Sequence, residues 1–191
     1  MAAVTFSPSL LKKHFPGAAI GMLVLTPLLY QCFGPSFSFL RGTLLTIFLL
    51  YITIFDLYYQ LIFDRVLWAM LACGLLFLIS PDAPALWGTL AAACIFSGFL
   101  LLLRLITRGG MGGGDIKLAF VLGIWLGPLP TLVAALSAFW LGGLAAFLLL
   151  VFTRAGRKAK IPFGPFLAAG AFIACLYAFK LAALYGSIFY G

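Results

Sequence analysis

Long apolar runs, separated by short breaks, organise this chain. The breaks contain proline and glycine, which end helices; they fall at Gly34-Pro35, Pro81-Asp82-Ala83-Pro84, Gly127-Pro128-Leu129-Pro130, and Pro162 with Pro165. A helix that spans a bilayer needs about 20 apolar residues, and fewer where neighbouring helices or a thinner bilayer help. The pattern predicts seven helices, over residues 17–34, 38–58, 65–80, 84–106, 115–127, 129–153 and 163–186. The fifth is short, so six spanning helices remain an alternative if one run is re-entrant.

Composition excludes a soluble globular core. Of the 191 residues, 65% are hydrophobic and only 8% are charged, whereas soluble domains carry about 25% charged residues. The sequence therefore predicts an all-α, polytopic membrane helix bundle in the lipid bilayer, with residues 1–191 forming a single membrane-embedded domain. The first apolar run lacks a small-x-small cleavage site, so we expect it to be retained as the first helix.

The net charge of +8 could suggest a nucleic-acid partner, but the basic residues lie in short clusters between apolar runs. That placement is typical of membrane topology and argues against nucleic acid. If the N-terminus is cytoplasmic, ten basic residues lie on the inner side: Lys12, Lys13, Arg65, Arg104, Arg108, Lys117, Arg154, Arg157, Lys158 and Lys160. Arg41 and Lys180 lie outside. This asymmetry supports the count of seven helices.

Acidic residues are scarce, which makes them informative. The chain has no glutamate and four aspartates, Asp56, Asp64, Asp82 and Asp115. Asp82 lies between two prolines, where a turn or helix-cap role is sufficient. Asp56 ends the second predicted helix and Asp115 begins the fifth, so two crossings separate them and both return to the cytoplasmic side. Ionisable groups at membrane depth are costly and usually functional.

Two carboxylates close together in a poorly hydrated site share a proton. One group can then activate a water while the other protonates a substrate carbonyl. A structural explanation exists for each residue: Asp115 could be a helix N-cap, and Asp56 could be an interfacial residue paired with Arg65. For each aspartate taken separately, the structural and functional interpretations are equally plausible. The occurrence of both aspartates together, in a chain with few other acids, favours a functional role.

Five glycines precede Asp115 within a short loop: Gly109, Gly110, Gly112, Gly113 and Gly114. Such a loop permits close backbone approach and positive φ angles. A phosphate-binding loop is a rival interpretation, but the G-x-x-x-x-G-K-[ST] pattern and a preceding strand are both missing from the sequence. We therefore expect a peptide substrate to lie against Gly112, Gly113 and Gly114, with a flexible loop as the alternative.

Three segments, in order, resemble a known family. Gly112-Gly113-Gly114-Asp115 resembles the GxGD motif of intramembrane aspartyl proteases, and GMGGGDIKLAFVLGIWLG around it resembles the signature of type 4 prepilin peptidases. The stretch from Phe55 to Asp64 resembles that family's first aspartate segment. The stretch Pro162-Phe163-Gly164-Pro165-Phe166-Leu167-Ala168 resembles its C-terminal PFGP segment. Together they cover the chain from about residue 50 to 170.

The resemblance implies that Asp56 and Asp115 are catalytic. It further implies cleavage after a glycine at the cytoplasmic face of the bacterial inner membrane, which removes a short basic leader from prepilin or pseudopilin substrates. Many family members carry a zinc-binding cytoplasmic insertion and also methylate the new N-terminus. This chain has neither the insertion nor paired cysteines, so we expect a short, peptidase-only form without metal or other cofactor.

Several residues have weaker functional signals. Asp64 could bind a basic leader, and Lys117 could tune Asp115 or contact lipid phosphate, although an interfacial role is the simpler interpretation of both. The isolated cysteines Cys32, Cys73, Cys94 and Cys175 are expected to be packing residues. The tryptophans Trp68, Trp87, Trp125 and Trp140 are expected at the interface or facing lipid.

Two other classes of function remain open at this point. A small proton-coupled transporter could use the aspartates as a relay, which requires acids near the membrane midplane and favours internal repeats. No inverted repeat is visible in the sequence. A non-catalytic membrane scaffold is the third possibility.

Overall fold

Helices make up the whole regular structure of the described residues. The computed structural model describes residues 8–80, 84–152 and 162–190. It contains seven helices: α1 (Pro8–Phe33), α2 (Phe37–Tyr59), α3 (Asp64–Phe77), α4 (Leu86–Ile106), α5 (Gly113–Leu126), α6 (Pro128–Phe152) and α7 (Gly164–Tyr190). The seven predicted helices and the all-α fold are confirmed. Asp82 and the basic cluster from Arg154 to Lys160 lie outside the described residues.

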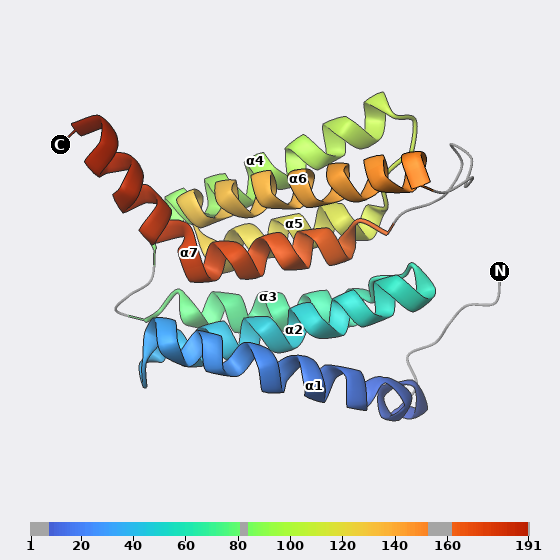
Figure 1. Cartoon of the computed structure of the whole chain (residues 1–191), viewed down its shortest axis with the longest axis horizontal. Coiled ribbons are helices and arrows are strands. Elements are labelled where there is room, and N and C mark those ends of the chain that lie inside the picture. The colour runs from blue at the N-terminus through green and yellow to red at the C-terminus, as the bar shows by residue number, and fades with distance from the viewer. Residues whose placement is uncertain (1–7, 81–83, 153–161, 191) are drawn as a thin grey trace.

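The helices run side by side and alternate in direction (Figure 1). In this view α1, α2 and α3 form one layer, while α4 to α7 form the other. The connections from α2 to α3 and from α4 to α5 lie at the same end of the bundle, and α7 begins at that end as well. Three segments that are distant in sequence therefore meet at one end.

Helix α5 occupies the centre of the second layer, where it contacts α3, α4, α6 and α7. Its residues from Val121 to Leu126 are all buried. A helix that is hydrophobic on every face is typical of such a position. Its 14 residues extend for about 21 Å, less than the roughly 30 Å of a bilayer's hydrocarbon core. Neighbouring helices, rather than lipid, surround most of it.

Among the described residues, four helices are long and apolar enough to span a membrane: residues 16–33 of α1, and all of α2, α4 and α6. Helices α3 and α5 have 14 residues each. Close contact between helices is possible because small residues lie at the crossings. Gly123 of α5 packs against the main chain of Ala93, and Gly170 of α7 packs against the main chain of Ala134. Small residues are typical of helix crossings in membranes.

The tryptophans divide into two groups. Trp68, Trp87 and Trp140 are 70%, 82% and 80% exposed, which confirms the prediction of interfacial or lipid-facing positions. The prediction is wrong for Trp125, which is fully buried in α5. Its Nε1–H donates a hydrogen bond to the Met70 carbonyl at 2.8 Å. This polar bond satisfies the indole N–H and ties α5 to α3.

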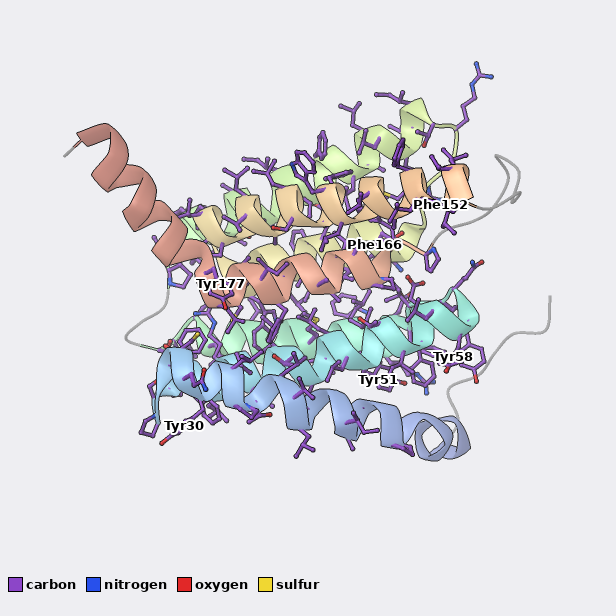
Figure 2. The ribbon with its side chains drawn as sticks, viewed as in Figure 1. Tyr30, Tyr51, Tyr58, Phe152, Phe166 and Tyr177 are labelled. Carbon is purple, nitrogen blue, oxygen red and sulfur yellow. The ribbon has the colours of Figure 1, made fainter. Side chains whose placement is uncertain are left out.

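Aromatic side chains mark both ends of the bundle. Tyr30 and Tyr177 lie at one end, and Tyr58 and Phe166 lie at the end where α7 begins (Figure 2). Aromatic residues of this kind are enriched where a membrane meets water.

Candidate active site

Asp56 lies near the end of α2 and is buried, with 6% of its surface exposed. Its Oδ2 accepts a hydrogen bond from the backbone N–H of Gly164 at 2.9 Å. The structural alternative, an ion pair with Arg65, is wrong: no such pair forms between these two described residues. A buried carboxylate held by a backbone donor and lacking a cation costs several kcal/mol of stability, and such groups cluster at functional sites.

Gly164 is the first residue of α7 and is required by its contact with Asp56. A Cβ atom at this position would lie 2.5 Å from Oδ2 of Asp56 and 3.0 Å from its Cγ. The sequence identified the segment around Gly164 as a motif but gave this glycine no role. The sequence did contain a signal for this role. Glycine is a poor helix former, so a glycine at the start of a helix, between Phe163 and Pro165, suggests a need for space rather than for helix stability.

Asp115 is the third residue of α5 and is 7% exposed. The N-cap of α5 is Gly112, so the interpretation of Asp115 as the N-cap is wrong. Its carboxylate instead reaches back and accepts a hydrogen bond from the N–H of Gly112, the arrangement of a capping box. A Cβ atom on Gly112 would lie 3.0 Å from Oδ2 of Asp115, so glycine keeps this side of the carboxylate uncovered.

Asp56 and Asp115 lie at the same end of the bundle. Helix α2 ends there and α5 begins there (Figure 1), and the electrostatic effect of Asp56 reaches Asp115. Neither forms an ion pair with another described residue. Each has one backbone N–H as donor, and a carboxylate can accept about four hydrogen bonds. The pair can therefore bind a water molecule and share a proton.

The glycine-rich loop approaches other segments closely, as expected, but its neighbours belong to the protein itself. A Cβ atom on Gly113 would lie 2.6 Å from Nη1 of Arg104, and one on Gly114 would lie 2.9 Å from Cβ of Ile62. Gly112 is exposed. Positive φ occurs at Gly109, with φ of 92°. The sequence did not identify Arg104 and Ile62 as neighbours of the glycine-rich loop, because only the fold brings them to it.

Asp64 and Lys117 pair with each other instead of with the aspartate pair. Lys117 Nζ lies 2.7 Å and 2.8 Å from the two carboxylate oxygens of Asp64. The two side chains are 59% and 58% exposed. This ion pair links the start of α3 to the first turns of α5, on the outer face of the bundle.

Metal ligands do not gather around the pair. In the residues that the structure describes, no group of three or more His, Cys, Asp or Glu side chains lies close enough to hold a metal ion. The four cysteines are free thiols; Cys94 is exposed and the other three are half-buried.

Comparison with known proteins identifies the family. Residues 43–148 match the model of the type IV leader peptidase family, which is more than half of the chain. The chain belongs to the type IV leader peptidase family. The matched range contains both Asp56 and Asp115, whereas Gly164 lies beyond it. No solved structure matches this member of the family.

The names of curated proteins with similar sequences agree with this family assignment. A prepilin leader peptidase/N-methyltransferase of Bacillus subtilis (strain 168) is 32% identical over 154 residues, covering 80% of this chain and 62% of the relative. One from Stutzerimonas stutzeri is 29% identical over 184 residues, covering 92% and 62%. The leader peptidase HopD of Escherichia coli is 35% identical over 130 residues, covering 63% and 81%. This leader peptidase family member thus spans about three fifths of the length of the first two relatives.

Proposed function

We propose that this chain is a membrane aspartyl endopeptidase that removes the short basic leader from prepilin or pseudopilin substrates. The observation that carries the proposal is the pair of buried carboxylates, Asp56 and Asp115, at one end of the bundle, each held by a backbone N–H. Membership of the type IV leader peptidase family, and relatives named as prepilin leader peptidases, support the same substrate class.

In the proposed reaction, Asp56 and Asp115 share one proton and hold one water. The ionised carboxylate removes a proton from the water as its oxygen attacks the scissile carbonyl carbon, while the neutral carboxyl donates its proton to the carbonyl oxygen. The resulting tetrahedral intermediate collapses when the C–N bond breaks. The proton taken from the water passes to the leaving amine, and one hydroxyl of the intermediate returns its proton to the carboxylate that had donated one, which yields the acid product and restores the pair. Burial of the pair strengthens these interactions, since they act in a region of low dielectric.

Gly164 and Gly112 would act as positioning residues. The N–H of Gly164 fixes one oxygen of Asp56, so the other oxygen is available to water. Because Gly112 has no side chain, a substrate backbone can pass beside the Asp115 carboxylate. Gly113 and Gly114 would shape the loop by admitting Arg104 and Ile62.

We infer that this end of the bundle faces the cytoplasm. Among the described residues, Arg65 is the second residue of α3, Arg104 and Arg108 lie at or just after the end of α4, and Lys117 lies early in α5, all at the end of the bundle that holds the aspartate pair. Arg41 lies early in α2, at the opposite end. Basic residues accumulate on the cytoplasmic side of bacterial membrane proteins. Helix α1 begins at this same end (Figure 1), so this orientation implies a cytoplasmic N-terminus, and membership of a family of bacterial leader peptidases supports location in the inner membrane.

The alternative of a proton-coupled transporter is less well supported. A relay across the membrane requires ionisable groups near the midplane. Asp56 lies three residues before the last residue of α2, and Asp115 is the third residue of α5, so both belong to one end of the bundle. An aspartate pair at one end of the bundle is suited to cleave a peptide segment that protrudes from the membrane surface.

Cleavage of a prepilin-like substrate by the purified chain in detergent or liposomes tests the proposal. Asp56→Asn and Asp115→Asn should each lower kcat by at least about a hundredfold, since an acid–base group contributes about 10²–10⁴. Asp82→Asn is the matched control, because it removes the same charge from a predicted turn and should leave cleavage unchanged. Wild-type rates in either site variant, or no cleavage by the unmodified chain, would contradict the proposal.

A further inference from the structure

The helix that carries Asp115 is reachable from the side at one place. From Leu118 to Leu126, every residue of α5 is buried except Phe120, which is half-buried. One turn earlier Lys117 is exposed and Ile116 is half-buried. Apart from the half-buried Gly113 and Gly114 at its start, the face formed by Ile116, Lys117 and Phe120 is therefore the part of α5, within the described residues, that is open to the side.

A groove of about 360 Å³ lies over this face, between α3, α4 and α5. Its body is apolar and includes Leu67, Trp68 and Leu71 of α3. The Asp64–Lys117 ion pair lies at one end of it. Because Asp64 begins α3, the charged end of the groove coincides with the end of the bundle that holds the aspartate pair.

We propose that this groove docks the apolar helix of a prepilin-like substrate, with the basic leader beside Asp64. The inference rests on the proposed function. A substrate anchored in the bilayer must approach from the side, and Ile116 at the wall of the groove is adjacent to Asp115 in the chain. The groove has an apolar body and a charged end. A prepilin-like substrate has a matching order, an apolar helix next to a basic leader. Asp64 is 59% exposed, so its carboxylate can accept further hydrogen bonds from a lysine or arginine of the leader.

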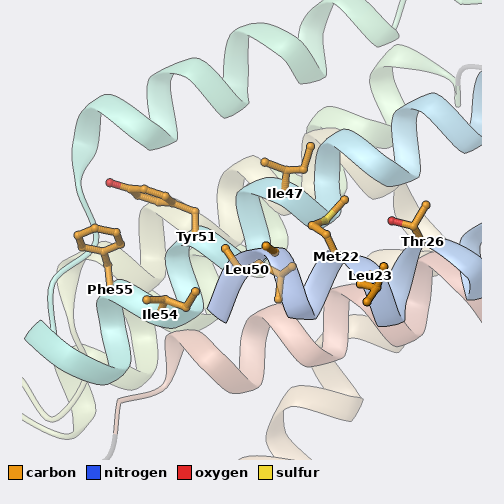
Figure 3. Close-up of a pocket in the computed structure, with 10 residues that line it drawn as sticks. Met22, Leu23, Thr26, Ile47, Leu50, Tyr51, Ile54 and Phe55 are labelled. Atoms are coloured by element: carbon orange, nitrogen blue, oxygen red, sulfur yellow. The ribbon is translucent and has the colours of Figure 1, made fainter. Parts of the chain in front are cut away.

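A second and larger groove fits this substrate less well. It has a volume of about 640 Å³ and lies between α1 and α2, with Tyr51 and Phe55 at one end and Thr26 near the other (Figure 3). Among the residues that the structure describes, no charged side chain lines it. Phe55 precedes Asp56, but the carboxylate of Asp56 accepts a hydrogen bond from Gly164 of α7. The described lining of this groove includes no ion pair and no residue of α5.

Photo-crosslinking distinguishes the two grooves. We would introduce p-benzoylphenylalanine at Trp68 in the groove beside α5, at Ile54 in the groove between α1 and α2, and at Leu102 as control. Leu102 is 53% exposed, about one turn from the end of α4, and lines neither groove. Asp115→Asn in each chain keeps the substrate uncut. The expected result is several-fold more substrate adduct at Trp68 than at either other position.

Two outcomes overturn the inference: a substrate adduct mainly at Ile54, or lipid adducts alone at Trp68. Cleavage by the unmodified chain, measured in the same membranes, separates this failure from failure of the proposed function. If cleavage occurs without an adduct at Trp68, only the groove is wrong; if no cleavage occurs, both proposals fall. A kinetic test uses Leu71→Trp, which fills the groove and should raise KM on the order of tenfold, while Leu102→Trp should not. An unchanged KM in Leu71→Trp would also overturn the inference.

Discussion

Replacing Gly164 with alanine should disable the site through a displacement of less than 1 Å. The added Cβ atom would lie 2.5 Å from Oδ2 of Asp56, whereas ordinary contact begins at 3.4 Å. Either the Asp56 carboxylate or the start of α7 must therefore move by about 0.9 Å, the difference between these two distances. A displacement of about 1 Å in a catalytic geometry can cost about a hundredfold in rate.

The assay measures kcat and KM for cleavage of a prepilin-like substrate. We expect Gly164→Ala to lower kcat by about a hundredfold with KM nearly unchanged, since the glycine positions Asp56 and does not line the proposed docking groove. Gly143→Ala is the matched control, because a Cβ atom on Gly143 would meet nothing within 4 Å. Thermal unfolding in detergent shows whether each variant is folded.

A folded Gly164→Ala variant with the wild-type kcat would refute this reasoning. It would mean that the contact between α7 and Asp56 is absent from the functional state of the protein, or that the position of Asp56 does not limit the proposed reaction. A variant with raised KM and normal kcat would assign Gly164 to substrate binding instead.

Three further predictions follow from the structure. Trp125→Phe should lower the stability of the folded state by about 1 kcal/mol, because it removes one buried hydrogen bond; an unchanged unfolding midpoint would show that the bond is unimportant. Asp64→Asn should raise KM for a substrate with a basic leader and leave kcat unaltered, and the rise should vanish for a leader without basic residues; a fall in kcat alone would place Asp64 in the chemistry. A chelator should not slow cleavage, since aspartates without histidine or cysteine partners are poor ligands for transition metals; loss of activity that added metal restores would disprove a metal-free mechanism.

The hydropathy pattern favoured seven helices and predicted that the two aspartates lie at the same end of the bundle, which permits them to meet. An even number of crossings returns the chain to the same side, so residues 56 and 115 had to share one end once seven helices were recognised. The sequence also singled out both residues, because acidic groups are so scarce in this chain. These inferences need only the order of apolar runs along the chain.

The same pattern could not distinguish a lipid-facing position from a position in the core. Trp125 lies in an apolar run like the other tryptophans, but α5 is enclosed by four helices, and its indole is buried. In a soluble protein, polar residues would mark the outer face of a helix; in a bilayer both environments are apolar. The sequence could not identify the residues that lie beside the aspartates, for a related reason. Gly164 and Arg104 are close to the site only because α7 and α4 begin or end there.

The most direct test of the central claim is a double-mutant cycle on the two aspartates proposed as catalytic, Asp56 and Asp115. It requires single-turnover cleavage rates for Asp56→Asn, Asp115→Asn and the double variant, with the wild-type chain as reference. Residues that act as one unit give losses that do not add. We predict that the double variant retains about the same residual rate as either single variant. Losses that multiply, or a single variant that cleaves at the wild-type rate, would show that the two carboxylates do not act together on one water.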